Sequence, residues 1–323
     1  MSKTVGFLQK HLCERGTTIA LYDYAVANEE VCDNISIIFY QSSNSLNVPD
    51  VVEKFKKRFI VIEYVSWKDI EKHIDKLGLD YLYVIKYGFK DESITTKIPC
   101  LIHSVFTWDP HGNYASVSHR IAHENKGEWL PHIVKPLPTS LNGKKAFRKR
   151  YNIPDSAYVY GRHGGKDTFS IEYTKEAIRE EIDSHPNVWF VFVNTNKFIE
   201  HPRVLFLPKI IDDLDKGDFI NACDAMIHGR LEGETFGLAI AEFISLGKPV
   251  LSCPAIITND NEHLYLGKDW VKVYHSKKEL NQLLWNTPVL VPITENPYLE
   301  YSPENVMRKF GQILGDDKNF TSL

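Results

Sequence analysis

Residues 228–250 read His228-Gly-Arg-Leu-Glu-Gly-Glu-Thr-Phe-Gly-Leu-Ala-Ile-Ala-Glu-Phe-Ile-Ser-Leu-Gly-Lys-Pro-Val250, and this stretch carries the strongest signal in the sequence. Gly237 stands where a predicted loop turns into a predicted helix. The N-terminus of a helix offers unpaired backbone N–H groups and a partial positive charge, so it attracts phosphate or sugar oxygens. Glu234 would lie in the loop and Glu242 just over one turn inside the helix. The two carboxylates could then reach opposite ends of one ligand, and carboxylates suit the paired hydroxyls of a ribose.

Short strand-like segments alternate with helical ones on both sides of this stretch. The strand-like segments contain Val, Ile, Phe and Tyr, which suit a buried pleated surface. Such alternation predicts βαβ units and a parallel sheet. The predicted strands are Tyr158–Tyr160, Val188–Asn194, Val204–Leu207, Ala225–His228 and Pro249–Cys253. The predicted helices are Glu172–Ser184, Asp215–Cys223 and Leu238–Ser245.

The first half of the chain shows the same alternation. Its predicted strands are Val5–Leu8, Ile35–Tyr40, Phe59–Val65, Tyr81–Tyr87 and Cys100–Phe106. Its clearest predicted helices are Pro49–Lys57 and Trp67–Leu77, and in the second of these the apolar residues recur at three- and four-residue steps. The first half is therefore predicted to form a second α/β domain.

Residues 131–154 interrupt the alternation with four prolines and the basic run 144–150. Prolines and a charge run indicate an interdomain connection. We expect the basic run to solvate a linker helix rather than to bind phosphate or nucleic acid. The predicted division is residues 1–140, residues 141–300, and a C-terminal helix and tail at 301–323. Ser302 and Pro303 are typical of an N-cap and first helical position, which predicts a last helix over Glu304–Leu314.

The predicted fold class is α/β, with two facing Rossmann-like domains. In open parallel sheets, ligands bind outside the C-terminal ends of the strands. If two such sheets face each other, the ligand site is expected in the cleft between the domains.

Length and composition agree with an ordinary globular protein. The 323 residues suggest about two domains, and they are 43% apolar and 25% charged. The net charge of −4 argues against a general nucleic-acid or membrane-surface binder, because both usually carry a basic excess.

The sequence also bears on the compartment. The five cysteines are widely spaced and form no CxxC pair, so we expect free thiols rather than disulfides or a zinc site. No apolar run reaches the roughly 18–20 residues of a membrane-spanning helix, and the first residues do not read as a secretory signal. We therefore expect a cytoplasmic protein, made in a bacterium or in a virus-infected cell.

The stretch around Glu234 resembles the C-terminal signature of retaining glycosyltransferases of the GT-B fold, notably family four (glycosyl transferases group 1). That signature reads Glu-x-Phe-Gly-Leu, three residues, Glu, and soon afterwards Gly-x-Pro-Val. It stands here as Glu234-Thr-Phe-Gly-Leu-Ala-Ile-Ala-Glu242 and Gly247-Lys-Pro-Val250. The resemblance implies that Glu242 holds the donor ribose and that Glu234 holds sugar hydroxyls. The donor-binding residues implied by this segment are Glu234, Thr235, Phe236, Gly237, Leu238 and Glu242.

Residues 151–166 extend the resemblance through an Ile-Pro lead-in, a strand and the segment Gly161-Arg-His-Gly-Gly-Lys166. In the family, the arginine and lysine hold the donor diphosphate, which implies this role for Arg162 and Lys166. Gly161 would let the backbone approach the phosphates. Arginine grips phosphate through its planar fork and lysine adds a point charge. The four-residue spacing departs from the longer insertion of the family, and a tight glycine turn with two solvated cations is the alternative.

The resemblance covers about Ile153–Val250, with weaker support over Leu137–Ile153, whereas the first 130 residues match only in architecture. It implies that residues 1–140 form the acceptor domain and residues 141–300 the nucleotide-sugar donor domain. The family has a glycine loop after its first strand, near the donor phosphate and the acceptor. Gly16 occupies the corresponding place in Arg15-Gly-Thr-Thr18. The resemblance implies a donor-binding role for Gly16, and a structural turn is the other interpretation.

Histidines and tryptophans of the first half supply further candidates. The stretch His103–His111 follows a predicted strand. Retaining members of the family often have a histidine at this place, close to the transferred sugar, which implies a catalytic role for His103. His111 is a second candidate and His119 an outsider, and any of the three could instead be a structural histidine. Trp108 and Trp129 could stack on a sugar face, although aromatic residues belong more often to a core.

Two other patterns have simpler explanations. Asp213-Leu-Asp215 has the DxD form of metal-dependent transferases, but it precedes a predicted helix, where acids commonly cap. Glycoside hydrolases also use a carboxylate pair, but Glu234 and Glu242 stand in a phosphate-binding setting. The family needs no metal, and no metal site is expected here.

The resemblance therefore implies a retaining glycosyltransferase that moves a sugar from a nucleotide-diphosphate donor to an acceptor hydroxyl of a glycan or another molecule. The catalytic residues would be Glu234, Lys166, Arg162 and His103. The donor is a co-substrate, and no cofactor is expected. Two alternatives stay open: a non-catalytic nucleotide-sugar-binding subunit and a GT-B nucleotide-sugar epimerase.

Overall fold

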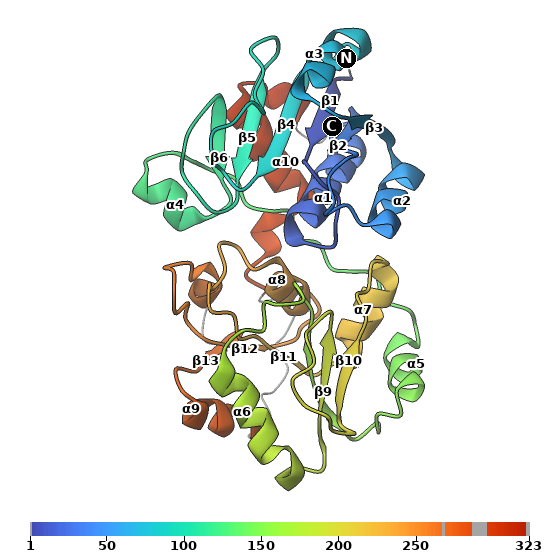
Figure 1. The fold of residues 1–323 in the computed structure, drawn as a ribbon, viewed down its shortest axis with the longest axis vertical. Coiled ribbons are helices and arrows are strands. Elements are labelled where there is room, and N and C mark those ends of the chain that lie inside the picture. The colour runs from blue at the N-terminus through green and yellow to red at the C-terminus, as the bar shows by residue number, and fades with distance from the viewer. Residues whose placement is uncertain (1, 267–268, 286–295, 321–323) are drawn as a thin grey trace. The chain divides into compact units, whose positions relative to one another are not determined.

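The computed structural model describes residues 2–266, 269–285 and 296–320 (Figure 1). The chain divides into two compact units, one formed by residues 1–133 and 300–323 and the other by residues 134–299. Each unit has its own sheet with interleaved helices, and every strand pairing is parallel. This confirms the predicted α/β class with two Rossmann-like domains.

The first unit contains a seven-stranded sheet in the order β3-β2-β1-β4-β5-β6-β7. Its strands are β1 (Thr4–Leu8), β2 (Ile35–Gln41), β3 (Ile60–Tyr64), β4 (Tyr81–Lys86), β5 (Cys100–Ser104), β6 (Asn113–Ser116) and β7 (Glu128–Trp129). Its helices are α1 (Gly16–Glu30), α2 (Pro49–Arg58), α3 (Trp67–Leu77), α4 (His119–Glu124) and α10 (Pro303–Leu314), with 3-10 turns at Leu299–Tyr301 and Asp317–Asn319. The short strands β6 and β7 lack an apolar run, so the sequence did not predict them.

Helix α10 belongs to the first unit although it follows the second unit in the sequence. Its Phe310 ring lies 5.8 Å from the ring of Tyr24 and 5.6 Å from that of Tyr83. Figure 1 shows α10 beside α1 and the strands of this unit. The Ser302 hydroxyl accepts from the backbone N–H of Asn305, which confirms the predicted N-cap. The sequence predicted residues 301–323 to be a helix and tail separate from the two domains. The ring contacts of Phe310 show that α10 packs in the core of the first unit.

The second unit contains a six-stranded sheet in the order β10-β9-β8-β11-β12-β13. Its strands are β8 (Tyr158–Arg162), β9 (Val188–Val193), β10 (Val204–Leu207), β11 (Ala225–Ile227), β12 (Val250–Ser252) and β13 (Val271–Val273). Its helices are α5 (Gly143–Arg150), α6 (Glu172–Glu181), α7 (Asp213–Ala222), α8 (Leu238–Ser245) and α9 (Lys277–Trp285), with 3-10 turns at Ile182–Ser184 and Glu262–Leu266. Strand β9 is apolar at every position because both faces of a parallel sheet are covered.

The basic run 144–150 forms α5, and one of its cations is structural rather than solvated. Arg148 is buried, pairs with Asp224 at 2.8 Å and donates to backbone carbonyl oxygens, including that of Ala157 at 2.9 Å. Lys144 also reaches Asp224, at 3.3 Å. The expectation of a solvated run was therefore wrong for Arg148, whereas Lys144 stays partly exposed. None of the described helices is long and apolar enough to cross a lipid bilayer.

Helix α7 packs closely against the backbone of Pro138 at Gly217. Alanine is ordinarily about 1 kcal/mol more favourable than glycine inside a helix. A Cβ atom at Gly217 would lie only 2.0 Å from the carbonyl oxygen of Pro138, so the backbone would have to move. We predict that Gly217→Ala lowers the free energy of unfolding in urea by about 1–3 kcal/mol. Gly16→Ala is the control, since its Cβ would meet no atom within 4 Å. An equal or greater stability of Gly217→Ala would contradict the packing.

Candidate active site

The strand order of the second unit reverses between β8 and β11, which are hydrogen-bonded neighbours. In open α/β sheets, ligands bind beyond the carboxyl ends of the strands at such a reversal. Arg162 is the last residue of β8, and His228 directly follows β11. The topology therefore brings these two side chains, from segments 66 residues apart in the sequence, to one edge of the sheet.

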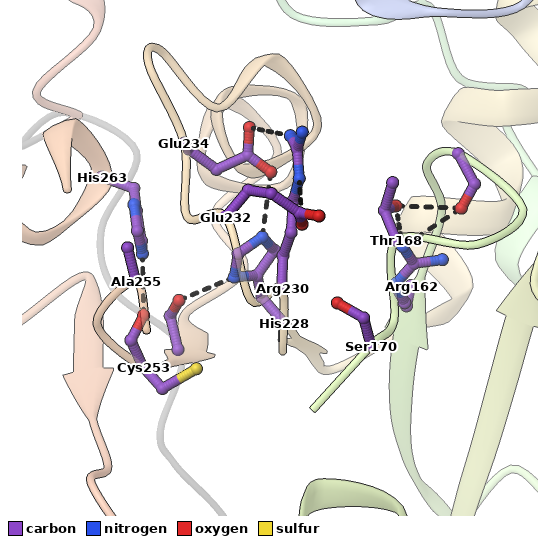
Figure 2. Close-up of polar contacts among 12 residues, drawn as sticks. Arg162, Thr168, Ser170, His228, Arg230, Glu232, Glu234, Cys253, Ala255 and His263 are labelled. Atoms are coloured by element: carbon purple, nitrogen blue, oxygen red, sulfur yellow. Dashed lines mark hydrogen bonds and ion pairs between the residues drawn. The ribbon is translucent and has the colours of Figure 1, made fainter. Parts of the chain in front are cut away.

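The Arg162 guanidinium is buried and bonded to hydroxyl groups (Figure 2). Its Nη1 donates to Thr195 Oγ1 at 2.5 Å, and its Nη2 donates to Thr168 Oγ1 at 2.6 Å. In the described part of the chain, it forms no ion pair with a carboxylate. Burial lowers the pKa of Arg162 to about 10, so the group is still a cation at neutral pH. Glu234 and Asp167 attract this charge without forming an ion pair with it. Burying a charge that has no direct ionic partner is costly, and a bound anion would reduce that cost.

Glu234 lies in the loop before α8 and is held by two neighbours. Its Oε1 lies 3.0 Å from His228 Nε2, and its Oε2 accepts from Arg230 Nη1 at 3.2 Å (Figure 2). The other ring nitrogen of His228, Nδ1, lies 2.8 Å from Ser252 Oγ, so the ring has a polar partner at each nitrogen. Burial opposes ionisation, but His228 and Arg230 outweigh it and lower the pKa of Glu234 to about 2. Glu234 is therefore an oriented carboxylate at neutral pH.

Glu242 lies inside α8, and both of its oxygens have cationic or imidazole partners. Lys216 Nζ donates to Oε1 at 2.6 Å, and His163 Nε2 lies 2.8 Å from Oε2. Burial again opposes ionisation, but Lys216 and His163 lower the pKa of Glu242 to about 2. Because Lys216 comes from α7 and His163 directly follows β8, this carboxylate joins three elements at the strand edge.

Two glycines shape the backbone around Glu234. Gly237 is the residue before α8 and has φ of +85°, a conformation that glycine adopts without strain. Gly233 has φ of +65°, and a Cβ there would lie 2.1 Å from the carbonyl oxygen of Asp260. Gly161 has a different reason: a Cβ would lie 2.3 Å from Cys223 Sγ, so this glycine allows close packing of the strand.

The remaining residues of the quoted motif surround these groups. Thr235 and Phe236 are buried, and the Phe236 ring lies 6.0 Å from that of Tyr298. Leu238 is the first residue of α8. Thr235, Phe236 and Leu238 thus stand at the start of the helix, beside Gly237.

Lys166 differs from Arg162, because its side chain is exposed. Its carbonyl oxygen accepts from the backbone N–H of Asn196 at 2.9 Å, which ties down the loop while leaving the ammonium group directed to solvent. The DxD-like acids Asp213 and Asp215 lie in the first turn of α7, and Asp212 caps this helix. Among the described residues, no group of three or more His, Cys, Asp and Glu side chains could hold a metal ion.

In the first unit, Gly16 and His103 have very different surroundings. Gly16 begins α1, and the space beside it is open. His103 is fully buried in β5, with Nδ1 2.7 Å from the Tyr83 hydroxyl and Nε2 2.8 Å from the carbonyl oxygen of Leu130. Burial lowers the pKa of His103 to about 4. Both ring nitrogens are occupied, as in a structural core histidine.

The other histidine and tryptophan candidates lie in the loops, helix and short strand that follow. His111 is buried, and its Nδ1 lies 2.7 Å from the carbonyl oxygen of Asp109. His119 begins α4, and its ring meets the edge of Trp129 at 5.1 Å. Lys309 Nζ lies 4.0 Å from the centre of the Trp129 ring. A Cβ at Gly127 would overlap the Trp108 ring, which therefore packs against the backbone.

No protein-family model matches the sequence, and no curated protein has a matching sequence. Solved structures match over nearly the whole chain. Anabaena HepE in complex with UDP and glucose has a TM-score of 0.70 at 14% identity, covering 98% of this chain and 100% of that chain. WaaG, a glycosyltransferase involved in lipopolysaccharide biosynthesis, has a TM-score of 0.60 at 12% identity, covering 98% and 97%. The chain has the GT-B fold.

The same GT-B architecture also occurs in a putative UDP-N-acetylglucosamine 2-epimerase from Listeria monocytogenes. That structure has a TM-score of 0.63 at 13% identity and covers 100% of both chains. At identities this low, the likeness is one of fold and does not establish the chemistry.

The structure adds residues that the motif alone did not reveal. His228 and Arg230 hold Glu234, while His163 and Lys216 hold Glu242. His228 and Arg230 stand inside the quoted stretch, so their polar character next to a buried strand was an available signal. Lys216 lies 26 residues before Glu242, and only the packing of α7 against the GT-B strand edge brings the two together.

The buried ion pair between Lys216 and Glu242 should make the stability of the fold depend on pH. Since the pKa of Glu242 is about 2, below its ordinary 4.5, the ionised carboxylate stabilises the fold above pH 4.5, and this contribution is lost as the pH falls toward 2. Lys216→Met should lower the free energy of unfolding by about 3–5 kcal/mol at pH 7, because it leaves a buried charge with one partner fewer. Loss of Lys216 should also raise the pKa of Glu242, because Lys216 is the main cause that lowers it. The carboxyl of the variant should therefore become protonated at a higher pH than that of the wild type, and the deficit should shrink as the pH falls.

Urea denaturation at pH 7 and pH 4 measures this deficit. Lys175→Met is the control, because Lys175 forms an exposed pair with Glu172, which is worth at most about 1 kcal/mol. The double variant Lys216→Met/Glu242→Gln should recover part of the loss. A Lys216→Met protein as stable as the wild type at pH 7 would contradict the assignment.

Proposed function

We propose that the protein is a retaining glycosyltransferase that uses a uridine-diphosphate sugar as donor. The observation that carries the proposal is the buried Arg162 cation, which has no carboxylate partner in the described residues and stands at the strand reversal of a GT-B domain. A donor diphosphate is an anion that would complete this site. The choice of uridine is supported by the similar structures of HepE, which hold UDP or UDP-glucose.

The proposed donor site follows the charges around Arg162. The diphosphate would lie between Arg162, Lys166 and the backbone N–H groups that begin α8. Glu242 would accept hydrogen bonds from the ribose hydroxyls, within a position fixed by Lys216 and His163. Glu234, fixed by His228 and Arg230, would accept from hydroxyls of the transferred sugar. Each carboxylate is ionised at neutral pH, so it acts as an acceptor rather than as a proton donor.

The reaction would break the bond between the anomeric carbon and the diphosphate oxygen, which leaves with the electron pair. The acceptor hydroxyl oxygen would form the new bond on the same face of the sugar, and its proton would pass to an oxygen of the departing diphosphate. The main contribution of the protein would be to stabilise the charge that grows on the leaving group and to orient both reactants. We propose that Arg162 and Lys166 provide this charge without a divalent ion.

Two alternatives are separated by what happens to bound donor. The structural likeness to the Listeria epimerase supports an enzyme that alters the donor sugar without an acceptor. A binding subunit would leave the donor intact. The sugar-bearing product distinguishes all three: a new glycoside, an epimerised nucleotide sugar or unchanged donor. The five free cysteines support a reducing compartment such as the cytoplasm for the proposed enzyme.

Donor binding should depend on Arg162 and not on a divalent ion. UDP should bind with equal affinity in EDTA and in magnesium, and Arg162→Met should weaken binding by roughly 10- to 100-fold, because hydrogen bonds to a charged group are worth about 1.5–3 kcal/mol. Calorimetry measures both, with Arg162→Lys as a milder variant and melting as the check of folding. The exposed Arg179 on α6 provides the control, Arg179→Met. Binding that disappears in EDTA and returns with magnesium would refute the metal-free proposal.

Lys166 should contribute more to turnover than to donor affinity. Lys166→Met should reduce turnover by about 100- to 1000-fold at saturating UDP-glucose, because charge on the diphosphate grows as the sugar bond breaks. UDP affinity should fall less, since Arg162 still binds the ground state. Lys197→Met, which removes another lysine paired only at the surface with Glu200, is the control. A turnover within about threefold of the wild type would exclude this role for Lys166.

A further inference from the structure

Three aromatic rings lie together at the C-terminal edge of the first sheet. Tyr87 directly follows β4, Phe89 is two residues further on, and Phe106 follows β5. The rings of Tyr87 and Phe89 stack at 5.0 Å with 13° between their planes, and those of Tyr87 and Phe106 lie 4.8 Å apart. We call this group the aromatic platform.

The aromatic platform is open to solvent rather than part of the core. Tyr87 is 54% exposed and Phe89 is 61% exposed, whereas Phe106 is half-buried beneath them. Large aromatic rings gain free energy from burial, so a set of exposed rings held together marks a surface that meets a ligand or partner.

Backbone hydrogen bonds, not burial, keep the rings in place. The N–H of Phe106 donates to the carbonyl oxygen of Tyr87 at 3.0 Å, and the N–H of Val105 donates to that of Lys86 at 3.1 Å. The Tyr114 hydroxyl lies 2.9 Å from the carbonyl oxygens of both Gly88 and Thr107. The loops after β4 and β5 are thus joined, and the exposed rings need no rearrangement before a ligand binds.

Gly88 explains why two neighbouring rings can face the same way. It has φ of +130°, and a Cβ there would lie 2.4 Å from Thr107 Oγ1 and 2.5 Å from Ser104 Oγ. The loop therefore bends tightly against the end of β5, and this bend brings the Tyr87 and Phe89 rings into contact. A larger residue at this point would be strained and would require Thr107 and Ser104 to move.

A polar network involves the same loop as the platform. Asp91, two residues after Phe89, accepts from Lys86 Nζ at 2.6 Å and from Lys10 Nζ at 3.0 Å. Lys10 follows β1 and Lys86 ends β4, the two neighbouring strands between which the order of the first sheet reverses. The network therefore stands where ligands of open α/β sheets bind, and it offers both hydrogen-bond donors and carboxylate lone pairs.

We propose that the aromatic platform binds a sugar ring of the acceptor, which makes the acceptor a glycan. This inference rests on the proposed function. A pyranose has one face of C–H groups, which stacks on an aromatic ring, and a rim of hydroxyls, which both donate and accept hydrogen bonds. Stacked rings beside a lysine–aspartate network match both properties. A purely apolar ligand would leave the network without a role.

The experiment measures sugar binding and donor binding separately on the full chain. Saturation-transfer NMR would use methyl glycosides and short oligosaccharides of glucose, galactose, mannose and N-acetylglucosamine, and calorimetry would use UDP. At least one sugar series should bind, and Tyr87→Ala and Phe89→Ala should each weaken it by roughly 3- to 10-fold. Phe89→Tyr should retain binding, and UDP affinity should not change in any variant. Because the substituted rings are exposed, the variants should melt like the wild type.

Ile60→Ala is the matched control. Ile60 is 59% exposed, but it begins β3 and so lies at the opposite, N-terminal edge of the same sheet. This substitution should leave sugar binding unchanged.

Three outcomes would overturn the proposal: UDP binds but no sugar does, the alanine variants bind sugar as well as the wild type, or the wild type is a dimer that these variants convert to monomers. In the last case the platform would bind a second copy of the chain. Sugar binding that depends on the platform in a protein that fails to bind UDP would support the platform and refute the proposed donor instead.

Discussion

Parallel pairing is the constraint on which the candidate site depends. Every strand of the second sheet runs in the same direction, so all six carboxyl ends meet at one edge. Arg162 ends β8 at this edge, and the loops that leave the edge carry His163, His228 and Glu234, although these residues come from two distant parts of the sequence. An antiparallel strand in this sheet would have sent one of these loops to the opposite edge.

Burial then decides how the charges at this edge are arranged. A desolvated carboxylate needs partners, and Glu234 and Glu242 each have two. Arg162 has hydroxyl and carbonyl partners at Nη1 and Nη2, and its buried Nε has no hydrogen-bond partner among the described residues. The two acids thus have direct ionic partners within the described protein, whereas the arginine is attracted by Glu234 and Asp167 without a direct ion pair. That difference, rather than the number of charged residues, makes the region suitable for an anion.

Much of this architecture could be predicted from the sequence, because buried parallel strands are short apolar runs. The segments around β8, β9 and β11 were recognisable for this reason. Strands β6 (Asn113–Ser116) and β7 (Glu128–Trp129) were not, since they are short and largely polar. The motif predicted Glu234 and Glu242 as a pair, but their partners depend on packing: Lys216 reaches Glu242 from another helix, and nothing in its local sequence indicates this. His103 shows the converse, because a histidine at the end of an apolar strand reads alike whether it is buried or exposed.

The return of α10 to the first unit has a consequence for the order in which the chain can fold. The second unit is one continuous segment, residues 134–299, inserted into the first. During synthesis, the whole of that segment leaves the ribosome before α10 does. The Tyr24 and Tyr83 rings of the first core then lack their Phe310 partner until α10 is made. The inserted domain can therefore complete its core first, and the N-terminal domain, although made earlier, is the last to be finished.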